Sequence, residues 1–137
     1  MPEVEHPDAE WRKILSPEQY AVLRQAATER PWSGALLNNH GRGTYACAAC
    51  GAELFESDTK FESGCGWPSF FRTVAPDAIE YIEDHAHGMV RVETRCGTCA
   101  SHLGHVFDDG PPPTGKRYCM NSLALKFVDP EGAVIPG

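Results

Sequence analysis

The stretch of sequence that decides the fold is a pair of short motifs, Cys47-Ala48-Ala49-Cys50 and Cys96-Gly97-Thr98-Cys99. Each motif is typical of a tight turn that directs two sulfurs at one point, and Gly51 and Gly97 permit the tight geometry. Two such turns supply the four thiolates of a tetrahedral structural zinc site. The 45 residues between the motifs (51–95) require a whole subdomain to be inserted between the two turns.

Other assignments of these thiols stay open. The four cysteines are also consistent with reduced core thiols, or with one redox-active C-x-x-C pair. His102 and His105 follow Cys99 at separations compatible with zinc and are alternative ligands. Because two complete C-x-x-C pairs already fill four coordination positions, four cysteines are the simpler ligand set. A closed site of this kind is structural, which leaves both histidines for other chemistry or for ordinary hydrogen-bonded positions.

The composition indicates one globular domain. The chain has 137 residues, of which 42% are hydrophobic and 23% charged, and this excludes a disordered chain and a coiled coil. A membrane span needs roughly 18 consecutive apolar residues, and the sequence has no such run. The net charge of -7 repels nucleic-acid phosphates and anionic lipids, so we expect neither as a partner.

The N-terminus bears on how the six cysteines are used. It is acidic and interrupted by proline, without the basic start and apolar run of a secretory signal. We therefore expect a cytoplasmic protein, in which thiols are kept reduced. In that compartment six cysteines indicate metal binding or redox catalysis rather than three disulfides.

The clearest helix signal begins at Ser16, which is followed by a proline at the first helical position and by Gln19 for a capping box. Leu15 and Tyr20 are spaced as a hydrophobic staple around this cap. Because Pro31 disfavours helical angles at the residue before it, we expect the helix to end near Glu29. The helix is expected to pack on the outside of a β core.

Beyond this helix, short runs alternate with a period of two. They predict strands over 79–83, 89–94 and 123–128, and the 13 glycines and 11 prolines predict many turns between strands. The sequence therefore predicts a mainly β fold, a compact single domain of antiparallel sheets. Residues 1–15 are expected to form an N-terminal extension with short helical structure, and residues 16–137 the domain itself.

Two cysteines belong to neither motif. Cys65 lies between two glycines and precedes a Trp-Pro step, which favours an exposed, shaped loop. Cys119 lies at the start of a predicted strand, where Arg117, Cys119 and Asn121 point to the same face. A nucleophilic cysteine needs positive charge or hydrogen-bond donors nearby, and Arg117 and Asn121 supply part of that. A buried small hydrophobe is the alternative interpretation of either thiol.

Five blocks of the sequence form a recognisable series. In chain order, they are the Cys47 motif, SDTKFESGCGWPSF at 57–70, the Cys96 motif, SHLGHVF at 101–107 and RYCMNS at 117–122. Together they resemble the methionine sulfoxide reductase B family, the peptide-methionine (R)-S-oxide reductases, in the family's order and over most of the chain, from about residue 16 to 128. Family members differ in whether they keep the four motif cysteines and the cysteine before Gly-Trp-Pro, and this chain has all five.

The resemblance implies an enzyme that reduces the R epimer of methionine sulfoxide in oxidised proteins, with the free amino acid left open as a substrate. It implies that Cys119 is the nucleophile and passes through a sulfenic acid. Cys65 matches the resolving position, so the product is a Cys65–Cys119 disulfide, which thioredoxin reduces. One structural zinc ion is held by the two motifs. We expect the enzyme to be a monomer.

The resemblance also implies a binding pocket. His105 and His102 match active-site positions suited to protonating the sulfoxide oxygen, and Asn121 is a further hydrogen-bond donor. Trp67 offers an apolar face to the S-methyl group, with Phe107 and Arg117 as further substrate-binding residues. As alternatives, Trp67 and Phe107 are core residues.

Two other classes of function are weighed against this enzyme. A zinc-bearing β module that only binds a protein partner has no need of Cys65, Cys119 and both histidines together. A disulfide oxidoreductase that uses one C-x-x-C pair for exchange is excluded if those thiols hold zinc.

Overall fold

The computed structural model describes residues 6–85 and 88–137, so residues 1–5 of the expected N-terminal extension lie outside the described part of the chain. Its helices are α1 (Asp8–Ile14), α2 (Pro17–Gln25) and the 3-10 turns η1 (Ser57–Thr59) and η3 (Ser122–Ala124). Its strands are β1 (Thr44–Cys47), β2 (Glu53–Glu56), β3 (Lys60–Phe61), β4 (Ser69–Phe70), β5 (Ile79–Asp84), β6 (Arg91–Cys96), β7 (His102–Phe107), β8 (Arg117–Met120), β9 (Leu125–Val128) and β10 (Val134–Pro136).

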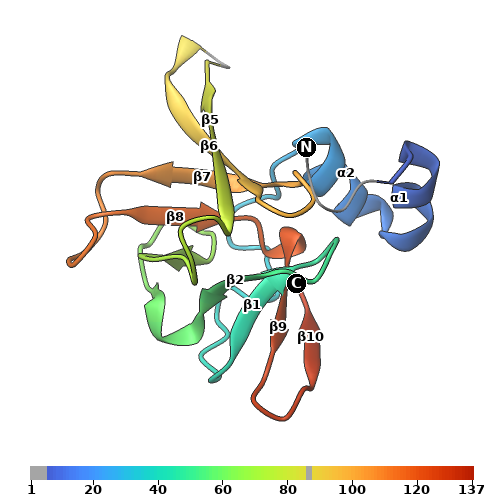
Figure 1. Ribbon diagram of the computed structural model, residues 1–137. Helices are drawn as coiled ribbons and strands as arrows, with labels where there is room; N and C mark the ends of the chain where they lie inside the picture. The colour runs from blue at the N-terminus through green and yellow to red at the C-terminus, as the bar shows by residue number, and fades with distance from the viewer. Residues whose placement is uncertain (1–5, 86–87) are drawn as a thin grey trace.

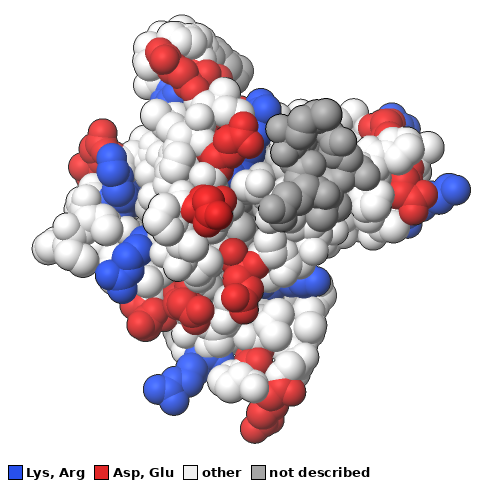
Figure 2. All heavy atoms as spheres, in the orientation of Figure 1, with Lys and Arg blue, Asp and Glu red and all other residues white. Residues whose placement is uncertain are grey.

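The strands form two antiparallel sheets, which confirms the predicted fold class. One sheet has the order β10-β9-β1-β2, and the larger one has the order β3-β4-β8-β7-β6-β5. In Figure 1 the smaller sheet lies below the larger one, the two helices lie to one side, and one end of β5 and β6 extends beyond the other strands of the larger sheet. On the face in Figure 2, acidic and basic side chains are interspersed.

A cluster of aromatic rings joins the two sheets. Phe70 of β4 stacks on Phe55 of β2, with ring centroids 4.3 Å apart, and meets Tyr45 of β1 edge to face at 4.9 Å. Tyr45 in turn packs against Phe127 of β9, and Tyr45, Phe55 and Phe70 are fully buried. Since each ring removes a large apolar area from water, this cluster supplies much of the energy that holds the two sheets together.

Helix α2 begins as predicted. The Ser16 hydroxyl accepts from the Gln19 backbone N–H, and the Gln19 side chain accepts from the Ser16 N–H, which completes the capping box. Leu15 is buried, and Tyr20 packs against the core beside it. The helix lies on β7 and η3, outside the sheets as expected.

The predicted end of this helix is wrong. It ends at Gln25, because Ala26 turns into the left-handed region with φ 56° and the Ala27 N–H bonds back to the Ala21 carbonyl. The earlier end frees the backbone of Glu29, whose N–H donates to Asn121. This long-range contact is invisible to a local helix signal.

The three predicted strands are found with shifted bounds. The run at 79–83 is β5 with one more residue, whereas the run at 89–94 is β6, which starts at Arg91 because Arg91 pairs with Asp84. The run at 123–128 gives β9 only from Leu125, since its first two residues belong to η3. Within 6–85 and 88–137, no helix is long and apolar enough to cross a membrane.

The Glu29 carboxylate fastens the chain after α2 to η3. Its Oε1 accepts from the Leu123 N–H at 2.8 Å, while Oε2 is buried without a hydrogen-bond partner among the described residues. Burial raises the pKa of this carboxyl, although the backbone donors of Leu123 and Ser122 oppose the shift. A raised pKa in the folded state means that ionised Glu29 costs stability, and this cost grows as pH rises above the ordinary glutamate value of about 4.3.

We therefore expect Glu29→Gln to raise the melting temperature at pH 7 to 8 by a few degrees, since glutamine keeps the acceptor for Leu123 without the buried charge. Near pH 4 the difference should vanish, because the wild-type carboxyl is then protonated. Thermal melts from pH 4 to 8 measure this, with the exposed Glu53→Gln as a control. A lower melting temperature of Glu29→Gln at pH 7 would contradict the argument.

Candidate active site and metal centre

The two C-x-x-C motifs meet in space, one from each sheet. Cys47 ends β1, Cys96 ends β6, and the four sulfurs all lie within 4.8 Å of one another. The Cys47–Cys99 and Cys50–Cys96 sulfurs are 3.7 and 3.6 Å apart. A tetrahedral zinc ion with Zn–S bonds of about 2.3 Å places its sulfurs about 3.8 Å apart. The cluster therefore fits a metal ion of that size and donor preference.

The two turns share one backbone design. The Gly51 N–H donates to the Cys47 carbonyl and the Ala100 N–H to the Cys96 carbonyl, both at 2.8 Å. The residue after each motif is left-handed, Gly51 with φ 82° and Ala100 with φ 63°. Gly51 is thus suited to its position by its left-handed backbone. Gly97 lies inside its motif and is not left-handed, so its requirement for glycine has a different cause. A Cβ at Gly97 would lie 2.2 Å from the Asp77 carbonyl oxygen, so only glycine fits this close packing.

A second pair of thiols lies apart from this cluster, where Cys65 and Cys119 approach to 3.3 Å between sulfurs. Cys65 lies on the loop between β3 and β4, and Cys119 is the third residue of β8 rather than its first. Ser63 and Ser69 hold Cys65, with hydroxyl oxygens 2.9 and 3.4 Å from its sulfur. The two cysteines are 54 positions apart in the sequence, so only the tertiary fold makes them a pair.

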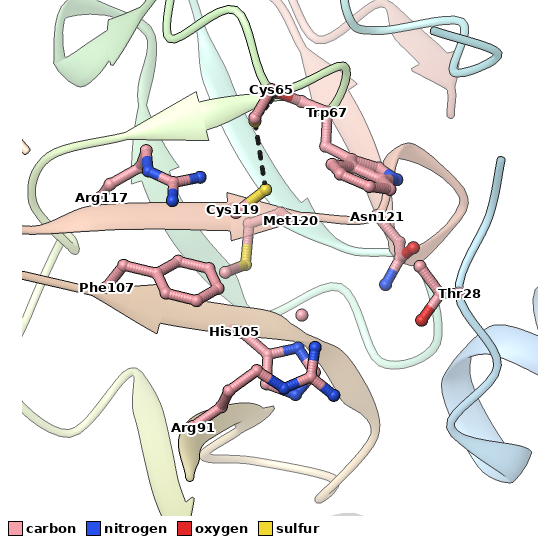
Figure 3. A pocket seen from close by; sticks show the side chains of 11 residues that line it. Thr28, Cys65, Trp67, Arg91, His105, Phe107, Arg117, Cys119, Met120 and Asn121 are labelled. Carbon is pink, nitrogen blue, oxygen red and sulfur yellow. Dashed lines mark hydrogen bonds between the residues drawn. The ribbon is translucent and has the colours of Figure 1, made fainter. Parts of the chain in front are cut away.

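The thiol pair borders a cavity of about 280 Å³, shown in Figure 3. This cavity, which we call the thiol pocket, brings together seven of the eight catalytic and substrate-binding residues proposed from the sequence; His102 is the exception. They are Cys65, Trp67, His105, Phe107, Arg117, Cys119 and Asn121.

The two histidines are held alike but placed differently. His105 lines the pocket, and its Nε2 lies 2.8 Å from Asp84, whose carboxylate also accepts from Arg91 at 3.3 Å. His102 is buried beside it, with the two ring centroids 5.7 Å apart.

The Nδ1 of His102 lies 2.7 Å from Glu93, whose carboxylate also accepts two bonds from Arg95. Burial lowers the pKa of His102 in spite of Glu93, so this ring is held neutral. The Nε2 of His102 is buried with no hydrogen-bond partner among the described residues. His102 thus packs against His105 and does not line the cavity.

The backbone of Glu29 orients two of the pocket residues. Its carbonyl accepts from the Trp67 indole N–H at 3.0 Å, and its N–H donates to Asn121 Oδ1 at 2.9 Å. Asn121 Nδ2 also donates to the Leu103 carbonyl at 3.0 Å, so the amide is fixed by two backbone contacts. Trp67 is therefore a pocket residue with a fixed ring plane.

Arg117 provides the positive charge nearest to the thiols. Its guanidinium lies 4.4 Å from the centre of the Phe107 ring and is paired with Asp109 at 2.9 Å. Burial raises the pKa of Cys119 well above the ordinary thiol value, and Arg117 opposes that shift. Cys65 differs, because hydrogen bonds from Ser63 and Ser69 outweigh its burial and lower its pKa to about 7.

Sequence reasoning missed several residues of the site. Thr28, Arg91 and Met120 also line the pocket. Arg91 and Asp84 come together only because they pair across β5 and β6. Neither belongs to a block with recognisable spacing, so only the strand register reveals them.

Comparison with known proteins places this geometry in a family. The SelR domain model matches residues 15–129. A peptide methionine sulfoxide reductase MsrB of Leifsonia xyli is 64% identical over 121 residues, covering 88% of this chain and 87% of that protein.

Relatives with the same name are found in Methanosarcina barkeri, 59% identical over 93% of this chain and 90% of the relative, and in Agrobacterium fabrum, 56% identical over 92% and 93%. The matched residues, 15–129, include both cysteine motifs and every residue that lines the thiol pocket. The chain therefore belongs to the SelR-domain family, the family of the peptide methionine sulfoxide reductases MsrB.

Proposed function

We propose that the protein reduces the R epimer of methionine sulfoxide through a Cys119 sulfenic acid and a Cys65–Cys119 disulfide, which thioredoxin then reduces. Family membership makes the chain an oxidoreductase that acts on methionine sulfoxide. The epimer, the order of the thiol steps and the reductant are our inference. The observation that carries it is the 3.3 Å contact between Cys119 and Cys65 at the edge of a pocket that also holds His105.

The first step needs a thiolate at Cys119. Burial disfavours this charge, and Cys65, whose pKa is about 7, is the more readily ionised thiol of the pair. The Cys119 proton therefore passes to the sulfoxide oxygen, with His105 as its carrier in the pocket, and Arg117 stabilises the negative charge that forms on Cys119. The alternative, in which Cys119 is a buried small hydrophobe, does not account for its place in the pocket.

Attack of Cys119 on the sulfoxide sulfur transfers the oxygen to the enzyme. The S–O bond of the substrate breaks, methionine is released, and Cys119 is left as a sulfenic acid. The oxygen gains negative charge during this transfer, so it needs a proton donor. His105 is the pocket group suited to that task, with Asp84 holding its ring and His102 buried behind it.

The second step regenerates the thiols. Cys65 attacks the Cys119 sulfenic acid, the sulfur–sulfur bond forms, and water leaves with the former sulfoxide oxygen. A disulfide needs sulfurs about 2.05 Å apart, so a movement of little more than ~1 Å closes the pair. Reduction by a dithiol such as thioredoxin completes the cycle.

The walls of the pocket support selection of one epimer. Trp67 and Phe107 offer apolar surface to the S-methyl group, and Asn121 and His105 offer polar groups to the oxygen. In Figure 3 the Trp67 ring and the His105 ring lie on different sides of the Cys119 sulfur. A sulfoxide bound between them presents one arrangement of methyl, oxygen and lone pair to that sulfur.

Zinc is the metal that we propose for the four-cysteine cluster, with Cys47, Cys50, Cys96 and Cys99 as its ligands. Four thiolates leave no position for a substrate, so the ion supplies stability rather than chemistry. It would tie the end of β1 in one sheet to the end of β6 in the other. The use of one motif as a redox pair is then excluded. We further propose a cytoplasmic monomer.

The nucleophile is tested by Cys119→Ser. This variant should lose at least ~10⁴-fold in reduction of the R epimer, because a hydroxyl is a far weaker nucleophile than a thiolate. An assay with the separated R and S sulfoxides measures this, and the wild-type enzyme should act on the R epimer alone. If the variant kept its turnover, the proposal that Cys119 is the nucleophile would be wrong.

The resolving cysteine is tested by Cys65→Ser. This variant should form about one methionine per enzyme in a single turnover and then stop when thioredoxin is the sole reductant. The yield of methionine and the loss of free thiols are followed together. Multiple turnovers under these conditions would show that another group resolves the sulfenic acid.

The structural metal is tested by Cys96→Ser, with Cys65→Ser as the matched control that removes a thiol elsewhere. The first variant should lose its zinc and, for a loss of ~3 kcal/mol, melt about 10 °C lower. The control should keep both the metal and the melting temperature. Metal analysis measures the zinc content and calorimetry the melting temperature. Equal zinc content in the two variants would contradict the assignment of Cys96 as a zinc ligand.

A further inference from the structure

We propose that the protein reductant docks in a second groove, which borders Cys65 but not Cys119, and attacks Cys65. This inference rests on the proposed Cys65–Cys119 disulfide. The groove has a volume of about 510 Å³ and lies over Phe61, Glu62, Gly64, Cys65 and Pro111, with Asp109 and Arg117 also lining it. We call it the reductant groove.

The sheet register separates the two approaches. In the larger sheet Cys119 of β8 pairs with Ser69 of β4 on one side and with His105 of β7 on the other. Cys65 contacts Ser69, so it lies on the β4 side of Cys119. Figure 3 shows the same order, with Cys65 and His105 on opposite sides of the Cys119 sulfur. The sulfoxide therefore reaches Cys119 from the β7 side.

The chemistry of exchange selects the other side for the reductant. A thiolate attacks a disulfide along the line of the sulfur–sulfur bond, from the side opposite to the leaving sulfur. To displace Cys119, the attacking thiolate must reach Cys65 from beyond Cys65, that is, from the edge of the sheet formed by β3. Phe61 of β3 and Gly64 line one wall of the groove, and Asp109 and Pro111 of the loop between β7 and β8 line another.

The accessibility of the two sulfurs agrees with this direction. Cys65 lines both the thiol pocket and the reductant groove, whereas Cys119 lines the thiol pocket alone among these two cavities. Arg117 also borders both, and it faces the sulfur that leaves. Its positive charge stabilises the Cys119 thiolate that the exchange releases.

An exposed tryptophan beside the groove indicates that the occupant is a protein. Trp32 is 66% exposed, and its backbone N–H donates to the Gly66 carbonyl of the Cys65 loop at 2.7 Å. Its φ of 68° is a left-handed angle that disfavours a bulky side chain, so the exposed position is held against a local cost. Trp32 shares a neighbouring hollow with Glu62 and Gly64. Exposed tryptophans are frequent anchors of protein interfaces, which a small thiol would not need.

The exchange balances without any further reactant. The first thiolate of a protein dithiol bonds to Cys65, and the Cys65–Cys119 bond breaks with its electron pair on Cys119, which takes a proton. The second thiol of the reductant then attacks the mixed disulfide and releases Cys65. The reductant loses two electrons and two protons, and the enzyme gains them.

The test separates the two halves of the cycle. Glu62 is an exposed side chain whose ion pair with His40 at 3.6 Å contributes little, so Glu62→Trp fills the groove without disturbing the core. Its matched control is Glu131→Trp, an exposed position in the turn before β10. We expect Glu62→Trp to raise the KM for thioredoxin about 5- to 30-fold. The KM of the Glu131→Trp control should equal the wild-type value.

The same variants are measured with dithiothreitol as reductant and in a single turnover without reductant. The single-turnover rate should match the wild type for Glu62→Trp, because the sulfoxide pocket is untouched. The dithiothreitol rate should fall far less than the thioredoxin rate, because a small dithiol needs only part of the groove. An unchanged KM for thioredoxin would overturn the groove. If the wild-type enzyme formed no methionine in a single turnover, the proposed function itself would be refuted. The failure of the groove and the failure of the proposed function are therefore distinguishable.

Two further measurements guard against a fold defect in Glu62→Trp. Trp32→Ala removes an exposed ring, keeps the backbone geometry and should raise the KM for thioredoxin while the dithiothreitol rate stays constant. A thioredoxin that lacks its second cysteine should be trapped as a mixed disulfide with the oxidised enzyme. Peptide mapping should find the trapped bond at Cys65, and a bond at Cys119 would overturn the direction of attack.

Discussion

The close contact between β7 and β8 is the constraint on which the active site depends. A Cβ at Gly104 would lie 2.1 Å from the Cys119 carbonyl oxygen, so only glycine allows the two strands to approach in this register. That register sets His105 beside Cys119. Because strand side chains alternate, a shift of β8 by one residue would turn Cys119 to the opposite face and separate the proposed nucleophile from His105, the proposed proton donor.

Around this pair, backbone groups hold side chains that line the thiol pocket. The carbonyl of Glu29 orients Trp67, and its N–H orients Asn121, while two carboxylates each hold one histidine. Groups held by the backbone lose little freedom when the substrate binds, which favours a fixed pocket. The four-cysteine cluster acts at a distance, since it joins the ends of strands from the two sheets rather than contacting the pocket.

Many groups of the candidate site were predictable because short sequence motifs identify them. The C-x-x-C motifs, the glycines around Cys65 and the cap at Ser16 all act over a few residues, and the sequence resemblance adds the roles of Cys119 and His105. Boundaries set by long-range contacts were less predictable. The chain after α2 and the η3 turn before β9 are held by hydrogen bonds that join Glu29 to Asn121 and Leu123, more than 90 residues away.

By itself, the sequence determined the fold class, the two cysteine motifs and the chemical types of the groups in the pocket, because these follow from composition, spacing and short motifs. Only the tertiary structure decided which groups face one another. The pairing of β5 with β6 brings Asp84 and Arg91 to His105. The order of β4, β8 and β7 sets Ser69 on one side of Cys119 and His105 on the other. Such contacts depend on strand register, which is fixed by packing across the whole sheet and not by any local stretch of residues.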